Sequence, residues 1–599
     1  MVEGISDDGL EARTDLAGST PLLHRLWPHA IVLALLLVGL LPFLNNGYPA
    51  MVDESVYSYQ AANLADGSWT SPRPLPDIDV DGWHGPLIDS TIVGDDWIPY
   101  ARQPFYPLLM APLFKLGGYS ALIGLSIVGT WVAALAAAQI ARRVDRRASI
   151  LTLWVTGIGT PLLFDAYVAV GHSLAAALAG ICALALLRSA CLGPTGDEPC
   201  LPSGLRWAWT AAAAVSAFLL VLVRSEGALV VGGLALTGAL LSMHLVDRRP
   251  AIHWKRAVAA CAVGISGVAA YFANAKWAAH LTSGANGAGG SLNRITDPLA
   301  QAWNSLLRPW GIDTRNASTT MALALVCLVL AALLLRLLPR RPLIGCALLC
   351  FGAVAAVVRQ FETVDQVSGL LATAPVLTFG LLLVGRSDLS RPAVQFLLGA
   401  SAFTTLGILW LAYGEGGAAE WGGRFYHVLI PLLVPVAVIV LFRVQASAAS
   451  VGYRRVVAAA LVIMTAATSV LSLRLLVDNR HLSRSVVRET MALSAEMDDP
   501  FVAVATVNPT GLSRLFWAEV RDGYPILNGG NLASFSDLLT RADAAGRDEV
   551  LLITDTSPIN VKYVVDKVLE RLDAEHTWSI ANAQALGGTG YLAVTLKKD

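Results

Sequence analysis

We expect the chain to be organised around one stretch, Pro49-Ala-Met-Val-Asp53-Glu54-Ser-Val-Tyr57-Ser-Tyr59-Gln60. The stretch follows the first strongly apolar run, Ala30 to Leu44, so two adjacent carboxylates lie where the chain leaves a membrane. An ionised carboxylate inside a bilayer costs about 2.5 to 3.5 kcal/mol, so acids near this depth favour a functional role over packing. The alternative is the hydrated start of an acidic loop.

The composition is that of a membrane protein. Hydrophobic residues make up 55% of the 599 and charged residues only 15%, against about a quarter in soluble domains. The net charge of −1 gives no reason to expect nucleic acid as a partner. The first residues are acidic and lack a basic segment, which favours a cytoplasmic disordered tail (1–24) over a cleaved signal peptide.

Apolar stretches near the roughly 20-residue length that spans a bilayer recur thirteen times. They lie at about 30–48, 119–141, 148–165, 168–188, 207–223, 227–246, 257–279, 319–338, 342–358, 367–385, 393–413, 425–443 and 456–476. Arginine pairs such as Arg142-Arg143, Arg340-Arg341 and Arg454-Arg455 fall in alternate loops. The positive-inside rule places these loops in the cytoplasm, which puts residues 45–103 and the tail outside.

The chain therefore divides into three expected parts: the tail 1–24, a transmembrane domain 25–477 with a first outside loop at 45–103, and a soluble domain 478–599. In the last part, runs at 501–507, 549–554 and 590–596 read as strands, and helical patterns lie at 511–520, 535–545 and 558–572. This alternation predicts an α/β domain. We find no catalytic constellation in it. The glycine-rich run 284–290 lacks the strand and helix of a nucleotide site, and no GxxxxGK[ST] motif occurs.

Further charged clusters fall at the outside ends of the predicted helices. They are Asp165 with His172, Arg224 with Glu226, Arg359 with Glu362, and Arg424 in Trp421-Gly-Gly-Arg-Phe-Tyr426-His427. Acids that deprotonate an acceptor or bind a metal, together with cations that neutralise a phosphate, are what transfer from a phosphate leaving group requires. The alternatives are arginines that reach to the interface, a helix-terminal His172 and a helix-capping Asp165. Tyr57 and Tyr100 offer aromatic faces for a sugar, or form an interfacial belt.

With these motifs and Tyr100-Ala-Arg102-Gln103-Pro104, the chain resembles bacterial GT-C fold glycosyltransferases over residues 25 to 476. Within them it is most similar to the protein mannosyltransferase and aminoarabinose transferase branch and its actinobacterial relatives, including arabinofuranosyltransferases. The acidic pair after the first helix is the most specific element. Relatives often have Lys-Pro-Pro where this chain has Arg102-Gln103-Pro104, which leaves open which cation meets the phosphate.

The resemblance implies a multi-pass bacterial plasma-membrane enzyme with an extracytoplasmic site. It implies transfer, usually with inversion, from a polyprenyl-phosphate sugar to a hydroxyl of a glycan, lipid or protein. Carried over, Asp53 is the catalytic carboxylate that deprotonates the acceptor, Glu54 assists it or orients the site, and Asp165 resembles the second acid at the next outside turn. The donor phosphate is bound by Arg102, Arg224, Arg424 and His172. Tyr57, Tyr100, Glu226, Arg359, Trp421 and Tyr426 contact substrate. The cofactor is none or one divalent cation, Mg or Mn, bound by Asp53 and Asp165.

Two other classes stay open. One is a secondary transporter or flippase of glycan or lipid precursors, although such proteins place charges near the midplane of the bilayer and often show repeated halves. The other is a membrane scaffold without catalysis, whose tail binds glycan. Neither the sugar nor the acceptor follows from the sequence.

Overall fold

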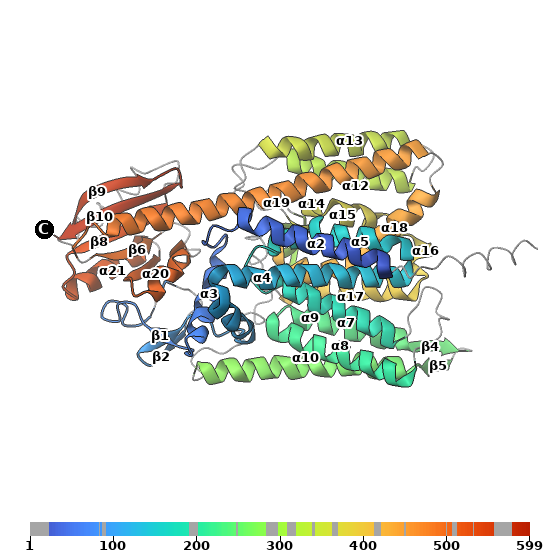
Figure 1. The fold of residues 1–599 in the computed structure, drawn as a ribbon, viewed down its shortest axis with the longest axis horizontal. Helices are drawn as coiled ribbons and strands as arrows, with labels where there is room; N and C mark the ends of the chain where they lie inside the picture. The colour runs from blue at the N-terminus through green and yellow to red at the C-terminus, as the bar shows by residue number, and fades with distance from the viewer. Residues whose placement is uncertain are drawn as a thin grey trace, which may run out of the picture.

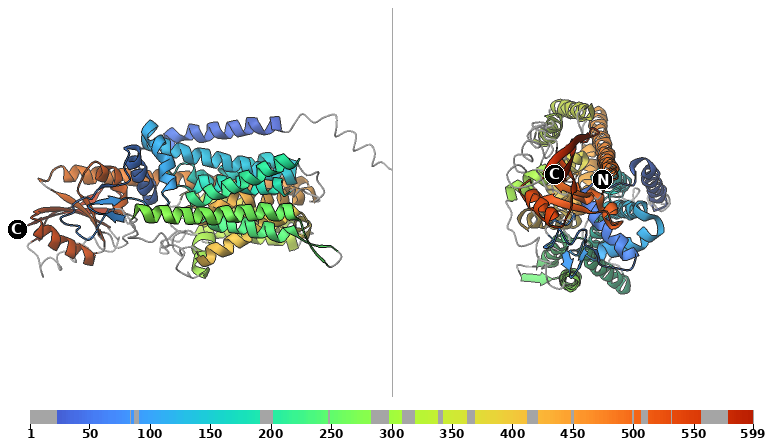
Figure 2. Two further views of the ribbon diagram at one scale, coloured as in Figure 1. Left: turned by 90° about the horizontal axis from the view of Figure 1, so that it is seen from below. Right: turned by 90° about the vertical axis from the view of Figure 1, so that its left-hand side faces the viewer.

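The computed structural model shows a long helical bundle with a mixed sheet at one end (Figure 1). It describes residues 23–82, 84–86, 91–190, 202–246, 249–282, 298–307, 319–337, 342–361, 369–411, 421–447, 451–498, 500–505, 512–530, 532–555 and 578–598. Two further views show that the sheet lies beyond the end of the bundle and not along its flank (Figure 2).

Ten helices of the described chain are long and apolar enough to cross a membrane. They are α2 (Leu23–Leu44), α4 (Phe105–Val144), α7 (His172–Ser189), α8 (Ser203–Val223), α10 (Trp254–Leu281), α12 (Thr319–Leu337), α13 (Pro342–Val358), α17 (Pro392–Leu411), α18 (Ile430–Ser447) and α19 (Val451–Ser494). The polytopic helical fold expected from the sequence is thus confirmed.

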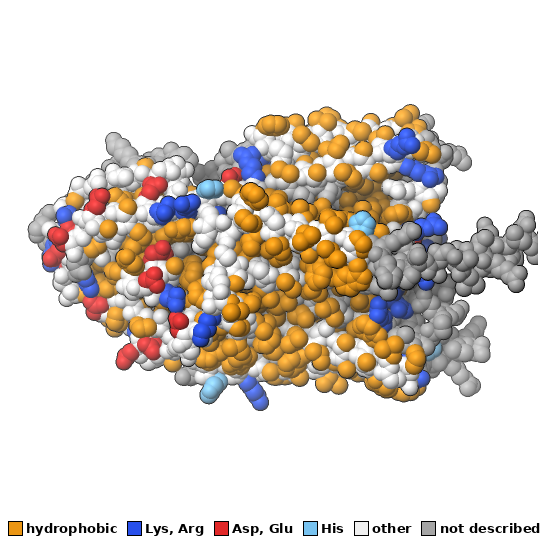
Figure 3. Space-filling model, in the orientation of Figure 1, with side chains coloured by type: hydrophobic (Ala, Val, Ile, Leu, Met, Phe, Trp, Pro, Cys, Tyr) orange, Lys and Arg blue, Asp and Glu red, His pale blue; other side chains and the backbone are white. Residues whose placement is uncertain are grey.

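The other three predicted spans are also helices, but short ones. They are α5 (Ser149–Ile158), α9 (Gly227–Ser242) and α15 (Pro375–Leu382), the last preceded by α14 (Leu370–Thr373). Each of the thirteen apolar stretches therefore falls on described helix, and the difference between thirteen and ten lies in helix length. On the face shown in Figure 3, hydrophobic side chains cover the bundle, and Lys and Arg side chains lie at both of its ends.

Helix α4 contains a sharp kink, which the sequence analysis did not predict. Gly117 and Gly118 leave helical geometry, with φ of −155° and +59°. A positive φ is strained for any residue with a Cβ, so glycine suits the second position. The predicted span at 119–141 is the part of α4 after this kink.

The C-terminal sheet has the order β7-β6-β8-β10-β9. Its strands are β6 (Phe501–Ala505), β7 (Ile526–Gly530), β8 (Glu549–Asp555), β9 (Trp578–Leu586) and β10 (Tyr591–Lys598). β6 pairs in parallel with β7 and β8, whereas β10 is antiparallel to β8 and β9. Helices α20 (Trp517–Arg521) and α21 (Leu532–Ala544) follow β6 and β7. The α/β layering is confirmed, although β7 and β9 were not predicted. The helix expected at 558–572 lies outside the described residues.

Helix α19 runs without interruption from the membrane bundle to the sheet. It is 44 residues long, and near its end the Glu489 carboxylate accepts a hydrogen bond of 2.7 Å from the amide of Gly587. The boundary that the sequence places at 477/478 therefore lies inside a helix. The apolar part of α19 ends near there, but the helix itself continues to Ser494.

The segment between α2 and α4, predicted as the first outside loop, packs against the C-terminal sheet domain. After α3 (Val52–Ala65), the loop makes a small sheet of β1 (Ser71–Pro72), β2 (Thr91–Val93) and β3 (Asp96–Ile98). Ile78 is buried in the core of the C-terminal domain. The carbonyl of His84 accepts a hydrogen bond of 2.7 Å from the amide of Asn528. The loop thus brings the C-terminal domain against α3.

Candidate active site

Helix α3 lies where the bundle meets the sheet domain (Figure 1). Asp53, in its first turn, points both carboxylate oxygens at arginines. Arg424 Nη1 lies 2.5 Å from Oδ2, and Arg514 Nη1 lies 2.9 Å from Oδ1. The Asp53 side chain remains 27% exposed. Three segments that are far apart in sequence therefore meet at the residue that the sequence singled out.

Two glycines with positive φ directly precede Arg424 and set the backbone that places it beside Asp53. Gly422 and Gly423 have φ of +79° and +67°, directly before the 3₁₀ turn η5 (Arg424–Leu429). A Cβ on Gly423 would lie 1.8 Å from the carbonyl oxygen of Ser305. The backbone packing at Gly423 therefore leaves no room for a side chain.

Replacing Gly423 with alanine is expected to destabilise the protein and to lower any activity that needs Arg424. The variant combines a strained positive φ with a clash against backbone, each costing about 1 to 3 kcal/mol. Thermal unfolding in detergent measures the loss. Gly94→Ala is the matched control, because Gly94 has a φ of +65° and open space at the Cβ position. Equal stability of the two variants would show that the contact with Ser305 is unimportant.

A second cluster is a buried ion pair at the end of α8. Arg224 donates through Nη2 and Nε to the two Glu226 oxygens, at 2.6 and 3.2 Å. Arg224 also donates to the Tyr57 hydroxyl at 3.3 Å, and that hydroxyl lies 3.2 Å from the Tyr100 hydroxyl. Burial raises the pKa of Glu226, but attraction to Arg224 outweighs it and lowers the pKa to about 2. Arg224, Glu226, Tyr57 and Tyr100 are thus brought together as one group.

This ion pair predicts an acid-sensitive contribution to stability. Glu226 titrates near 4.5 when unfolded and about 2 when folded, so its ionised form stabilises the fold above pH 4.5 and the effect fades as the pH falls toward 2. We expect Glu226→Gln to lower the free energy of unfolding by roughly 3 kcal/mol at pH 7. The difference from wild type should shrink between pH 5 and pH 3. A constant difference over thermal melts from pH 7 to 3 would contradict the predicted linkage.

A third cluster contains Asp165, His427 and His172, all buried. His427 Nδ1 lies 2.6 Å from Asp165 Oδ2, and the rings of His172 and His427 meet edge to face with centroids 5.7 Å apart. Asp165 ends α6 (Leu162–Asp165), and His172 begins α7. The second predicted acid is therefore bound to a histidine that the sequence interpretation had given no role.

The three clusters are connected through shared elements. Asp53 and Tyr57 are one helical turn apart on α3, so they lie on the same face. Arg424 and His427 both belong to η5. His172 is close enough to Glu226 to lower its pKa by attraction. The residues of these three clusters thus lie around the N-terminal half of α3 as one group.

Glu54 has a different environment from its neighbour Asp53. It is fully buried and accepts hydrogen bonds from the amides of Ala50 and Met51 at 2.6 and 3.1 Å. Its other oxygen accepts from the Tyr119 hydroxyl and the Ala169 amide, both at 2.7 Å.

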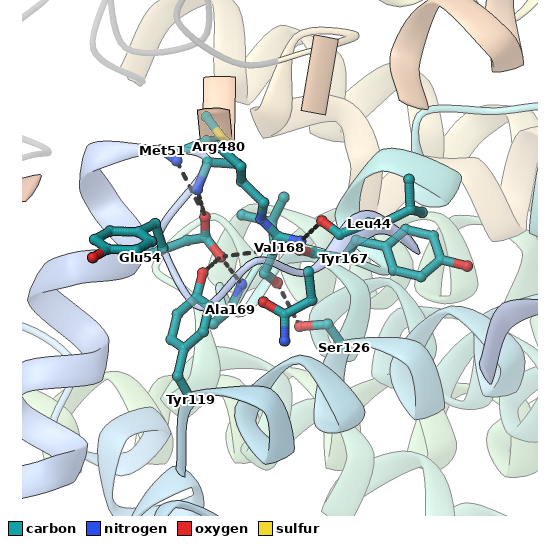
Figure 4. A network of polar contacts seen from close by, with 12 residues as sticks. Leu44, Met51, Glu54, Tyr119, Ser126, Tyr167, Val168, Ala169 and Arg480 are labelled. Carbon is teal, nitrogen blue, oxygen red and sulfur yellow. Dashed lines mark hydrogen bonds and ion pairs between the residues drawn. The ribbon is translucent and has the colours of Figure 1, made fainter. Parts of the chain in front are cut away.

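The same buried network includes Arg480 of α19 (Figure 4). Arg480 Nη2 lies 3.9 Å from Glu54, and the guanidinium donates to the carbonyls of Leu44 and Tyr167. Burial raises the pKa of Glu54, and the attraction of Arg480 opposes this. Glu54 therefore anchors the start of α3, and its predicted catalytic assistance stays a prediction.

The remaining predicted residues lie in varied settings. The Arg102 side chain is exposed, whereas Arg359 is buried in the turn η4 (Arg359–Phe361). Trp421 and Tyr426 are buried in the bundle core, which gives them a packing role here. Their predicted contacts with substrate stay predictions. Glu362 lies outside the described residues.

Two arginines that contact the acidic pair were not singled out from the sequence: Arg514, which contacts Asp53, and Arg480, which lies near Glu54. Arg514 lies in a helical pattern of the tail that we interpreted as having no catalytic constellation. Arg480 follows the last apolar run, and the sequence interpretation gave it no role. A charged residue on a helix leaving the membrane was the available signal for Arg480, whereas nothing local distinguishes Arg514.

The described residues do not fit the predicted metal site. Both oxygens of Asp53 accept from guanidinium groups, and Asp165 is bound to His427. Across the described ranges, no three His, Cys, Asp or Glu side chains come together as metal ligands. We therefore derive no step through a divalent cation.

Comparison with known proteins identifies the fold. No protein-family model matches the sequence, and neither does any curated protein. The apo oligosaccharyltransferase of Archaeoglobus fulgidus is 13% identical, with a TM-score of 0.50 over 91% of this chain and 71% of that one. Apo ArnT from Cupriavidus metallidurans is also 13% identical, with a TM-score of 0.48 over 96% of this chain and 98% of that one. The likeness to the oligosaccharyltransferase is one of fold alone, and it supports the GT-C fold for this chain.

Proposed function

We propose that the protein is an integral membrane glycosyltransferase that moves a sugar from a polyprenyl-phosphate donor to an acceptor hydroxyl on the extracytoplasmic face, with inversion. The observation that carries this proposal is Asp53, a partly exposed carboxylate on α3 between Arg424 and Arg514. A carboxylate that can take a proton lies directly beside cations that can neutralise a phosphate. The GT-C fold, shared with an oligosaccharyltransferase, supports the same reaction class.

The chemistry assigns a role to each group. The acceptor oxygen attacks the anomeric carbon, and its proton passes to Asp53. The bond between that carbon and the phosphate oxygen breaks, and its electron pair leaves with the polyprenyl phosphate. Negative charge therefore grows on the phosphate, where arginine is well suited to bind it in a bidentate manner. Arg424 is the nearest predicted phosphate ligand to Asp53.

The position of the charges also separates this proposal from a transporter. Arg224 follows α8, Glu226 precedes α9, and Arg424 precedes α18, so all three lie at helix ends. Transporters more often bind substrate on broken helices near the midplane of the bilayer. The orientation with this end outside the cell is part of the proposal and follows from the positive-inside rule.

Transfer by the purified protein in nanodiscs tests the proposal. Radiolabelled polyprenyl-phosphate mannose, arabinofuranose and aminoarabinose are supplied in turn with a cell-wall glycan extract, a lipid acceptor or a protein acceptor. We expect label to move from one donor to an acceptor. If no donor is consumed under any condition, while proteoliposomes accumulate a labelled glycan precursor, the transporter class replaces this proposal.

A further inference from the structure

We propose that Arg514 is a phosphate-binding residue which the C-terminal domain contributes to the membrane site, and that the donor phosphate takes Arg514 and Arg424 from Asp53. The inference rests on the proposed function and deepens it. It makes the soluble domain a part of the reaction site rather than an accessory that selects acceptors.

The three side chains place two donors for a phosphate side by side. The guanidinium groups of Arg424 and Arg514 both meet at the Asp53 carboxylate. The Arg514 and Arg424 side chains are only 10% and 18% exposed, while Asp53 is 27% exposed. The group is thus reached from solvent most easily at the carboxylate. A phosphodiester brings one negative charge and several acceptor oxygens to this position, and it can bind both guanidinium groups.

The backbone of Arg514 is fixed independently of Asp53. Arg514 lies in the turn η6 (Leu512–Phe516), where it is flanked by buried Ser513 and Leu515. The Ser513 hydroxyl donates a hydrogen bond of 2.7 Å to the carbonyl of Pro86 in the first outside loop. Because the turn is attached at this second point, releasing Asp53 does not release the backbone of Arg514. Only the guanidinium needs to move for an exchange of partners.

The other end of α3 provides a contrast. Arg521 of α20 pairs with Asp66 at 2.6 Å, and these side chains are 28% and 64% exposed. The C-terminal domain therefore contacts α3 through an arginine–aspartate pair at each end of the helix. The pair at Asp66 lies on the surface, at the end of α3 opposite to Asp53 and Arg424. The pair at Asp53 is the more buried one and contains the second arginine.

Binding of farnesyl phosphate to the full-length protein in detergent tests the proposal. We expect Arg514→Gln to weaken binding about tenfold or more, because a charge-assisted hydrogen bond is lost. Arg514→Lys should retain part of the affinity. Asp53→Asn should tighten binding several-fold, since the arginines lose their competing partner. Arg521→Gln, which removes the exposed pair with Asp66 at the other end of α3, should stay within twofold of wild type.

The results of the transfer assay and the binding assay, taken together, separate a failure of this inference from a failure of the proposed function. If wild type transfers sugar and binds farnesyl phosphate, but Arg514→Gln binds as Arg521→Gln does, the inference alone is overturned. If Asp53→Asn binds no more tightly than wild type, the exchange of partners is wrong. Inorganic phosphate that displaces the probe at equal concentration would identify free phosphate as the ligand. A wild-type protein that neither binds the probe nor transfers sugar would overturn both proposals together.

Discussion

Asp53→Asn is expected to lower sugar transfer at least a hundredfold while the protein still accumulates in the membrane. A positioned general base contributes roughly 10² to 10⁴ in rate, and asparagine cannot take the proton of the acceptor. The amide has nearly the same shape, and its oxygen can still accept from one arginine. The effect should therefore appear in kcat, with little loss of folded protein. Initial rates with the donor found in the nanodisc assay provide the measurement.

Asp66→Asn is the matched control for this substitution. It changes an aspartate of the same helix region that also pairs with an arginine of the C-terminal domain. Its exposed pair contributes little to stability, so transfer should stay within about twofold of wild type. Full activity of Asp53→Asn, or an equal loss in both variants, would remove Asp53 from the reaction and leave it a role in joining the domains.

Arg480→Met is expected to cause the largest loss of stability among the variants considered. The substitution removes a cation 3.9 Å from a fully buried Glu54 and two hydrogen bonds to carbonyls. Removing one partner of a buried ion pair costs about 3 to 5 kcal/mol, because the other charge remains buried. We expect a much lower unfolding temperature in detergent and little protein in the membrane.

The same helix supplies the control for Arg480. Arg474 is 43% exposed and pairs with Asp478 one turn away, so Arg474→Met should change stability by at most about 0.5 kcal/mol. The double variant Glu54→Gln/Arg480→Met should regain part of the lost stability, since no unpaired charge is left. Wild-type stability in Arg480→Met would show that Glu54 does not depend on this arginine.

Much of the fold could be predicted from local patterns, because the length and spacing of apolar residues in a segment indicate whether that segment forms a helix or a strand. Apolar length located each of the ten spans found in the described part of the chain, and strong runs located β6, β8 and β10. Strand β7 was missed because Ile526-Leu-Asn-Gly-Gly530 has only two apolar residues and resembles a turn. Strand β9 was missed because its centre, Ala581-Asn-Ala-Gln-Ala585, alternates polar residues only with alanine and contains no strongly apolar run. Neither strand can be recognised without the neighbour that pairs with it.

The site was predictable in part for the same reason. Adjacent residues on a helix point about 100° apart, so Asp53 and Glu54 were expected to play separate roles. Which of them is buried depends on Tyr119, Ala169 and Arg480, and no local pattern contains those contacts. Arg514 reaches Asp53 across 461 positions of sequence. Contacts at such separation follow from the tertiary fold and not from periodicity.

The long separation between Asp53 and Arg514 also has a consequence for biogenesis. At a synthesis rate of about 5 to 20 residues per second, the ribosome needs roughly 20 to 90 seconds after Asp53 before it adds Arg514. During that interval the helices can enter the bilayer with the carboxylate in place but without its C-terminal partner. If Arg514 binds the donor phosphate as proposed, a chain that is released early inserts into the bilayer without this residue and is inactive.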